Sequence, residues 1–369
     1  LDGTGDLSPT LTLLDWQGGE GSGRAVDLAV GTPGSGNDFL LVADGGEQVR
    51  LYELSGDPGS AGWAPQYSDT GSFTVTDATF TRVAAEGTTV LVAQEGPLPE
   101  FGASDPFAGD EAQLHLLSYG AGVLTEDGDS PIGGQALGGV FAGSVTHTDE
   151  VLYRLQALEL ADGNTGYLGF IREGFTTDGG GNVTAREVGA ALYEIDINNF
   201  STTAGDFVTA EALDGGDPVL SVDNLAFDNV DTVYATTTAA IAGTPTALRS
   251  LDVASLGTGS ADTVVDSSSL QNGNGLVVVP ALDGMSNGTV DAALVADGAN
   301  GLFRLDAENG GDLARFAPSR FIRGMATGTT SGTRYVAIAD DGEGIRIYSD
   351  SGDGSFPQEQ LLQKPGTIL

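Results

Sequence analysis

The sequence has no cysteine, which excludes disulfide bonds and thiolate metal sites. Basic residues are scarce: 14 lysines and arginines stand against 52 aspartates and glutamates, for a formal net charge of −38. Lys364 is the single lysine. An acidic surface of this kind repels nucleic acids and anionic membranes, and no apolar run reaches the roughly 18 residues of a membrane-spanning helix. We therefore expect neither a nucleic-acid partner nor membrane insertion.

Hydrophobic residues make up 40% of the chain and occur in patterned runs, so the sequence predicts a folded protein rather than a disordered acidic chain. Excess acid with almost no lysine resembles the surface of halophilic proteins, and an ordinary secreted acidic protein is the equal alternative. The chain starts LDGTGDLSPT, without an initiator Met or a signal peptide. We expect an extracellular, periplasmic or cell-surface protein in its mature form.

Glycine is abundant, at 57 of 369 residues, and favours turns, while the many threonines and valines favour strands. Two stretches near opposite ends share one layout, LLVADGGEQVRLYEL at 40–54 and VAIADDGEGIRIYSD at 336–350. A third copy, LVADGANGLFRLD, occupies 294–306. The step from Val295 to Ile338 is 43 residues, which is typical of one four-stranded propeller blade.

Weaker copies between these stretches bring the number of units to six. The sequence thus predicts an all-β fold: a single β-propeller of six four-stranded blades, with seven blades as the runner-up. Radial repetition of this kind leaves only short, protected sheet edges. The approximate blades are 17–75, 76–132, 133–213, 214–270, 271–320 and 321–369. We expect the N-terminal strand 10–16 to close the ring as the outer strand of the last blade.

The copy at 293–306 resembles the LVIVD-type repeat of surface and secreted β-propellers. The matching residues are Ala296, Asp297, Gly298, Gly301, Leu302, Leu305 and Asp306. The resemblance covers about a quarter of the chain, and it implies a propeller at the cell surface. It implies no catalytic residues, because that family has none to carry over.

Acidic residues recur where the second strand of each unit is expected to end. The residues are Asp44, Glu95, Glu173, Asp297, Asp340 and Asp341, whereas the fourth unit has threonines at 236–238. Acid–glycine pairs form turns readily, which explains the pattern without a ligand. The functional alternative is a ring of carboxylates on one face that binds Ca²⁺ or a basic ligand. The inserts 97–111 and 175–187 are expected to rise from that same face.

Catalytic motifs are few. His115 is expected to be a strand residue, and His147 lies beside two acids in a loop. The leading hypothesis is a secreted or surface-displayed binding or scaffold module, stabilised by Ca²⁺ and without an organic cofactor. Its partner would be a protein, a glycan or a cationic ligand. The alternatives are a Ca²⁺-dependent hydrolase, resembling propeller phytases or lactonases (the latter with Glu173 and Asn224 at a metal), and a self-assembling surface-layer or filament subunit.

Overall fold

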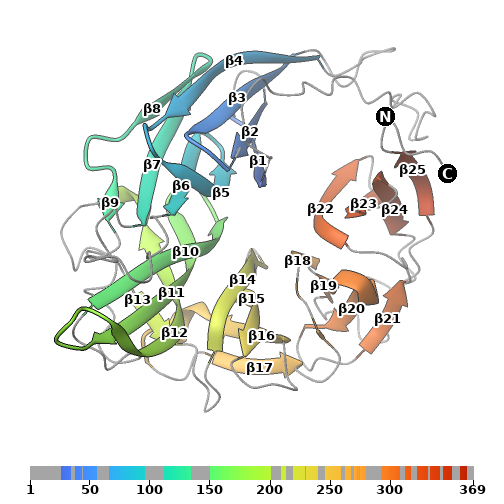
Figure 1. Ribbon diagram of the computed structural model, residues 1–369. Coiled ribbons are helices and arrows are strands. Elements are labelled where there is room, and N and C mark those ends of the chain that lie inside the picture. Colours follow the sequence, from blue (N-terminus) through green and yellow to red (C-terminus); the bar gives the residue numbers. More distant parts are fainter. Residues whose placement is uncertain are drawn as a thin grey trace.

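The fold is taken from a computed structural model of the chain (Figure 1). The structure describes residues 26–34, 38–43, 45–55, 66–95, 112–133, 150–200, 209–212, 219–228, 230–239, 246–258, 262–266, 270–271, 273, 275–279, 292–307, 312–316, 322–330, 333–340, 344–350 and 358–363. Regular structure in these residues consists of β-strands and three short 3-10 helices, at 197–199, 253–255 and 298–300. The prediction of an all-β fold is confirmed.

The strands in the described part of the chain form antiparallel sheets, and their order in each main path follows the sequence. The first sheet contains β1 (Asp27–Gly31), β2 (Phe39–Ala43), β3 (Gln48–Ser55) and β4 (Gln66–Thr74). The second contains β5 (Thr79–Glu86), β6 (Thr89–Glu95), β7 (Gln113–Gly120) and β8 (Val123–Glu126), with the short β9 (Ile132–Gly133) also paired to β7. The third contains β10 (Glu150–Leu160), β11 (Thr165–Thr177), β12 (Val183–Asp196) and β13 (Thr209–Ala212).

Three further sheets complete the described chain. The fourth contains β14 (Val219–Phe227), β15 (Thr232–Ala239), β16 (Thr246–Asp252) and β17 (Asp262–Asp266). The fifth contains β18 (Gly275–Val279), β19 (Ala292–Ala296), β20 (Leu302–Asp306) and β21 (Asp312–Phe316). The sixth contains β22 (Ile322–Thr330), β23 (Thr333–Asp340), β24 (Gly344–Asp350) and β25 (Gln358–Gln363). Each sheet lies within one of the six ranges named above, except that Gly133 falls one residue beyond its range.

The repeated stretches at the two ends of the sequence are the middle hairpins of the first and sixth sheets. Val42 pairs with Arg50 across β2 and β3, and the matching Ile338 pairs with Arg346 across β23 and β24. The identical register follows from the identical spacing of apolar residues around an acid- and glycine-rich turn. The same local signal therefore produces the same hairpin twice.

Consecutive sheets pack against each other through their first strands. β1 contacts β5, β5 contacts β10, β10 contacts β14, β14 contacts β18, and β18 contacts β22. Figure 1 shows the sheets following one another around a central space, with these first strands innermost. The first and sixth sheets stand apart at the two ends of this arc.

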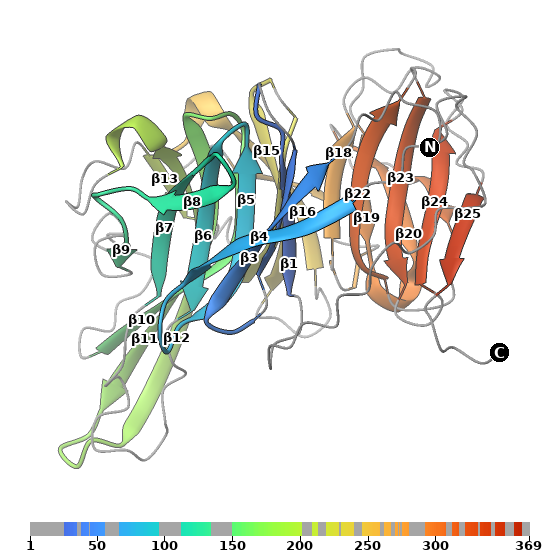
Figure 2. The same cartoon turned by 90° about the horizontal axis from the view of Figure 1, so that it is seen from above.

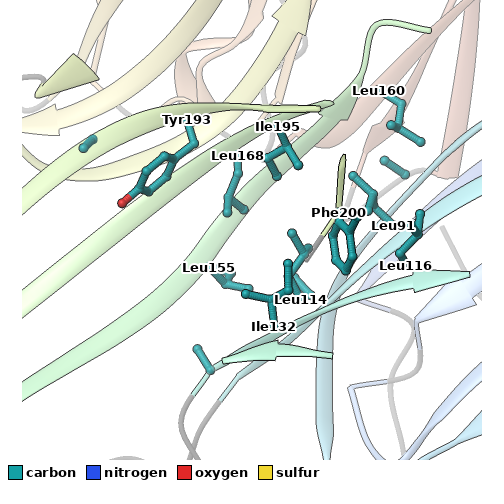
Figure 3. Close-up of a cluster of buried hydrophobic side chains, with 14 residues drawn as sticks. Leu91, Leu114, Leu116, Ile132, Leu155, Leu160, Leu168, Tyr193, Ile195 and Phe200 are labelled. Carbon is teal, nitrogen blue, oxygen red and sulfur yellow. The ribbon is translucent and has the colours of Figure 1, made fainter. Parts of the chain in front are cut away.

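Clusters of buried apolar side chains fill the spaces between consecutive sheets. The cluster between the second and third sheets includes Leu91 and Leu114 on one side and Leu168 and Tyr193 on the other (Figure 3). Full burial of one leucine side chain stabilises the fold by about 2 kcal/mol. Because an inner sheet buries both faces, its strands read as nearly continuous apolar runs, as in TVLVAQE of β6.

One apolar sheet face is exposed at the start of the arc. Leu28 and Val30 of β1 each keep 60% of their surface exposed. They pair with Val42 and Leu40 of β2, so the four side chains share one face of the first sheet. The opposite face, with Leu41, is packed against the second sheet. The first sheet is thus covered on one side only.

The prediction that the second strand of the third unit ends at Glu173 is wrong. β11 continues to Thr177 and β12 begins at Val183, so most of 175–187 forms a long hairpin instead of an irregular insert. The aromatic and β-branched residues Phe175-Thr176-Thr177 favour this extension, and the Asp178 carboxylate accepts N–H bonds from Gly180 and Asn182 to close the turn. Figure 2 shows the hairpin reaching well beyond the other sheets.

Two other sequence predictions involve segments outside the described residues. The predicted closing strand 10–16 is one, and the insert 97–111 is the other. The structure does show that β25 occupies the outer position of the sixth sheet, paired with β24. A strand from 10–16 is therefore not needed to complete the four strands of that sheet.

Candidate functional site

The predicted ring of turn carboxylates is described only in part. Asp44 and Asp341 lie outside the described residues. Glu173 and Asp340 lie within β11 and β23, and only their backbone is described. Glu95 ends β6, is half-buried, and has its Oε1 4.0 Å from Nε of Arg154. Among the described residues, no group of three or more His, Asp or Glu side chains is arranged to hold a metal ion.

Asp297 follows β19 as predicted, but its side chain is fully buried. Its Oδ1 accepts the backbone N–H of Gln271 at 2.8 Å, and its Oδ2 accepts the side-chain amide of Asn300 at 2.9 Å. The first of these bonds ties the turn to the segment that precedes β18. The turn-forming interpretation therefore holds for Asp297, whose carboxylate stabilises the backbone and is not presented at the surface.

Replacing Asp297 with alanine is expected to destabilise the protein by about 2–3 kcal/mol, because the hydrogen bonds that its buried carboxylate accepts from Gln271 and Asn300 are lost. Urea denaturation at pH 7 would measure this loss, with Asp129→Ala in the exposed turn after β8 as the control. Equal midpoints for the two variants would contradict the structural role of Asp297.

The threonines that replace acid in the fourth unit are also engaged. Thr236 accepts a hydrogen bond from the Asn224 side chain at 3.1 Å, and Thr237 accepts one from Nε of Arg249 at 3.2 Å. Thr238 donates its hydroxyl to Oδ2 of Asp223 at 2.7 Å. The bonds of Thr236 and Thr238 reach Asn224 and Asp223 on β14, the first strand of the same sheet, whereas Thr237 is bonded to β16. Asn224 and Asp223 in turn border an acidic region at the inner strands.

That region is a cavity of about 450 Å³ at the centre of the arc, called the central cavity below. Its wall includes residues from β1, β5, β10, β14, β18 and β22, the first strand of every sheet. Four carboxylates belong to the wall: Asp27, Glu86, Glu159 and Asp223. Arg82 of β5 is the basic residue among the described wall residues. The fold thus brings together acids that lie up to 196 positions apart in the sequence, from Asp27 to Asp223.

Asp27 and Asp223 are held in place by hydrogen bonds. Oδ2 of Asp27 accepts the backbone N–H of Val83 at 2.9 Å, which links β1 to β5. The two oxygens of Asp223 accept hydroxyl groups from Ser221 at 2.8 Å and Thr238 at 2.7 Å. Burial raises the pKa of both carboxyl groups, and their hydrogen bonds and the charge of Arg82 oppose this rise.

Glu159 is in a different position. Part of the residue is exposed, because it lines the cavity. Its carboxyl group, however, is surrounded by protein atoms. Burial raises the pKa of Glu159 to about 8, and the charges of Asp27 and Glu86 act in the same direction. No hydrogen bond or ion pair compensates its charge within the described residues. Glu159 therefore carries a proton through much of the neutral pH range.

Thr238→Val is expected to destabilise the protein by about 1–2 kcal/mol, because Asp223 loses a hydroxyl donor that the isosteric valine cannot replace. Chemical denaturation at pH 7 would measure the loss, and Thr125→Val on the exposed strand β8 supplies the matched control. If Thr238→Val behaved like Thr125→Val, the hydroxyl would not be supporting Asp223.

His115 lies in β7, as predicted, and is buried away from the wall of the central cavity. Its Nδ1 lies 2.8 Å from Oε1 of Glu126 and its Nε2 lies 3.0 Å from Oε1 of Gln94. Burial lowers the pKa of His115, and Glu126 opposes that shift. The arrangement links β6, β7 and β8 within one sheet and is structural. His147 lies outside the described residues.

The two residues considered for a lactonase-type metal site do not both line the central cavity. Asn224 belongs to the cavity wall, and its side-chain amide donates to Thr236 and to the carbonyl of Gly273. Glu173 lies on β11, which contributes none of the described wall residues.

The sequence interpretation missed Asp27, Glu159 and Asp223 as site residues. A signal was present: each is an acid inside a first-strand apolar run, in AVDLAV, LYRLQALEL and SVDNLAF. An acid at such a position has to lie in a polar cavity or be paired.

The comparisons leave the family of the chain open. None of the described helices is long and apolar enough to span a membrane. The LVIVD-type resemblance stays a prediction that rests on the residues at 293–306. No protein-family model matches the chain, and no curated protein matches its sequence significantly.

Proposed function

We propose that the chain is a six-bladed β-propeller whose ring closes when the sixth sheet packs on the first. The supporting observation is the repeated interface, since each pair of consecutive sheets is joined by an apolar cluster. The exposed apolar face with Leu28 and Val30 offers the surface for one further cluster, between the sixth and the first sheet. An apolar sheet face of this kind is stable when another sheet covers it.

Val30→Gln tests this closure, because a polar side chain on a buried closing face costs free energy. Val123 on β8 provides a matched control, since the two valines are 60% and 57% exposed. We expect Val30→Gln to lower the free energy of unfolding by about 1–2 kcal/mol and Val123→Gln to change it by less than about 0.5 kcal/mol. Equal small changes would show that the face around Val30 is open in solution.

We further propose that the protein is a binding module that takes a cationic ligand into the central cavity. One observation carries this proposal: Asp27, Glu159 and Asp223, from three different sheets, share one cavity, and the pKa of each is raised there. Crowded carboxylates repel each other, so a bound cation stabilises the fold that holds them together. Perturbed carboxyl groups in a central cavity are typical of functional sites.

The cavity supports a cation site better than the turns do, because Asp297 is already used as a backbone acceptor and Glu95 lies 4.0 Å from Arg154. A secreted or surface-displayed setting suits this activity, since such a module would meet cationic ligands in solution. Calcium stays among the cations that the proposal has to test.

Thermal melting with CaCl₂, MgCl₂ and spermidine, at an ionic strength matched with KCl, tests the binding proposal. We expect at least one of these cations to raise the melting temperature beyond its KCl control. The double variant Asp27→Asn/Asp223→Asn should lose that increase, whereas Asp129→Asn should keep it. If none of the three cations stabilises the wild-type protein beyond KCl, the proposal is wrong.

A further inference from the structure

The wall of the central cavity is predominantly polar, and its charges come from the four carboxylates and Arg82. Among the described residues, these carboxylates form no group arranged to hold a metal ion. A volume of about 450 Å³ is within the range of pockets that hold small organic ligands. The cavity therefore suits an organic cation better than a single metal ion.

The charges around Glu159 come from three neighbouring elements. Asp27 faces the cavity from β1, Arg82 and Glu86 from β5, and Asp223 from β14. The described wall residues of β18 and β22 are the uncharged Gly275, Leu276 and Met325. Asp27 and Glu86 are the charges that act on Glu159 most strongly, and both oppose its ionisation. A cation bound next to Glu159 would instead favour the ionised form of its carboxyl group.

We infer that the ligand of the central cavity is an organic ammonium ion, such as a lysine side chain or a small alkylamine, and that its binding displaces the proton held by Glu159. This inference rests on the proposed cation-binding function. The exchange is balanced in charge: an alkylammonium ion and a neutral carboxylic acid become an ammonium–carboxylate pair, and one proton goes to solvent. Asp27 and Asp223 keep their hydrogen bonds and supply the surrounding negative potential.

The proton exchange couples affinity to pH. Glu159 is mostly protonated at pH 7 and mostly ionised at pH 9, so the cost of removing its proton falls as the pH rises between these values. As the pH rises from 7 to 9, the amine therefore binds more tightly and its binding releases fewer protons. Alkylamines remain protonated below about pH 10, as lysine does.

Isothermal titration calorimetry with pentylamine tests this inference. Titrations at pH 7 in phosphate and in HEPES, whose ionisation enthalpies differ, give the number of protons released per amine bound. We expect close to one proton for the wild-type protein and for Asp129→Asn. For Glu159→Gln, we expect no coupled release and an affinity at least about tenfold lower. Melting and far-UV circular dichroism would confirm that the variant is folded.

Each other outcome is informative. Pentanol binding as tightly as pentylamine would overturn the ammonium requirement, and amine binding with no proton release would overturn the role of Glu159. Stabilisation by Ca²⁺ but not by pentylamine would overturn the inference while leaving the cation-binding function intact. If neither pentylamine nor any tested cation bound, the inference and the proposed function would fall together.

Discussion

Glu159→Gln is expected to stabilise the protein at pH 8 while leaving its stability nearly unchanged at pH 4.5. The pKa of Glu159 is about 8 in the folded protein, against an ordinary value of 4.5. Between these pH values the folded state binds a proton that the unfolded state has already lost. The free energy of unfolding therefore falls as the pH rises from about 4.5 to about 8. Glutamine resembles the protonated acid and removes this dependence.

The full pKa difference corresponds to about 4–5 kcal/mol. Glu159 is only partly buried, so solvent screens part of this difference, and we expect the variant to exceed the wild type by about 2–3 kcal/mol at pH 8. Urea denaturation at pH 4.5, 6 and 8 would measure the difference. Asp129→Asn removes one exposed charge of the same sign and is expected to give a small, pH-independent change.

A constant difference between Glu159→Gln and wild type across this pH range would contradict the account of Glu159. It would mean that the carboxyl group reaches bulk water and ionises as an ordinary glutamate. Salt gives a second check, because screening weakens repulsion between surface acids more than repulsion within the cavity. The effect of the variant at pH 8 should therefore persist in 0.5 M KCl, a salt concentration at which the Debye length is about 5 Å.

Gly169→Ala is expected to destabilise the protein by about 2–3 kcal/mol. Gly169 lies in β11, where the third sheet packs on the fourth. A Cβ atom at this position would lie 2.6 Å from Cγ1 and 2.8 Å from Cβ of Val222, and 3.0 Å from Cβ of Ala157. These neighbours belong to a buried cluster and cannot move away cheaply, so the two sheets would have to separate.

Gly120→Ala is the control for this substitution. Gly120 ends β7, and a Cβ atom there would have no heavy atom within 4 Å. Alanine at such a strand position is neutral or slightly stabilising, because it restricts the unfolded chain. Equal melting temperatures for Gly169→Ala and Gly120→Ala would contradict the close approach of the third and fourth sheets.

The sequence was sufficient to predict the local elements of this fold. Apolar alternation around an acid–glycine turn specifies a hairpin by itself, which is why Val42–Arg50 and Ile338–Arg346 pair as the repeat suggests. Glu173 shows the limit of the same rule. An acid followed by glycine ends a strand only when the next residues cannot continue the ladder, and Phe175-Thr176-Thr177 can continue it.

The candidate site was harder to predict because it depends on how sheets assemble. Nothing near Asp27 in the sequence indicates that Glu159 and Asp223 will share its cavity. Their proximity follows from the stacking of first strands around one centre, which is a tertiary feature. Turn acids such as Asp297 attracted attention because they recur, yet the Asp297 carboxylate is occupied by hydrogen bonds from Gln271 and Asn300.

A crystal structure of the protein with pentylamine would test the central claim most directly. The account predicts a closed ring, with the sixth sheet covering Leu28 and Val30, and the ammonium group within hydrogen-bonding distance of the Glu159 carboxylate. Ligand bound at the turns that carry Asp297 and Asp340, with the central cavity empty, would contradict it.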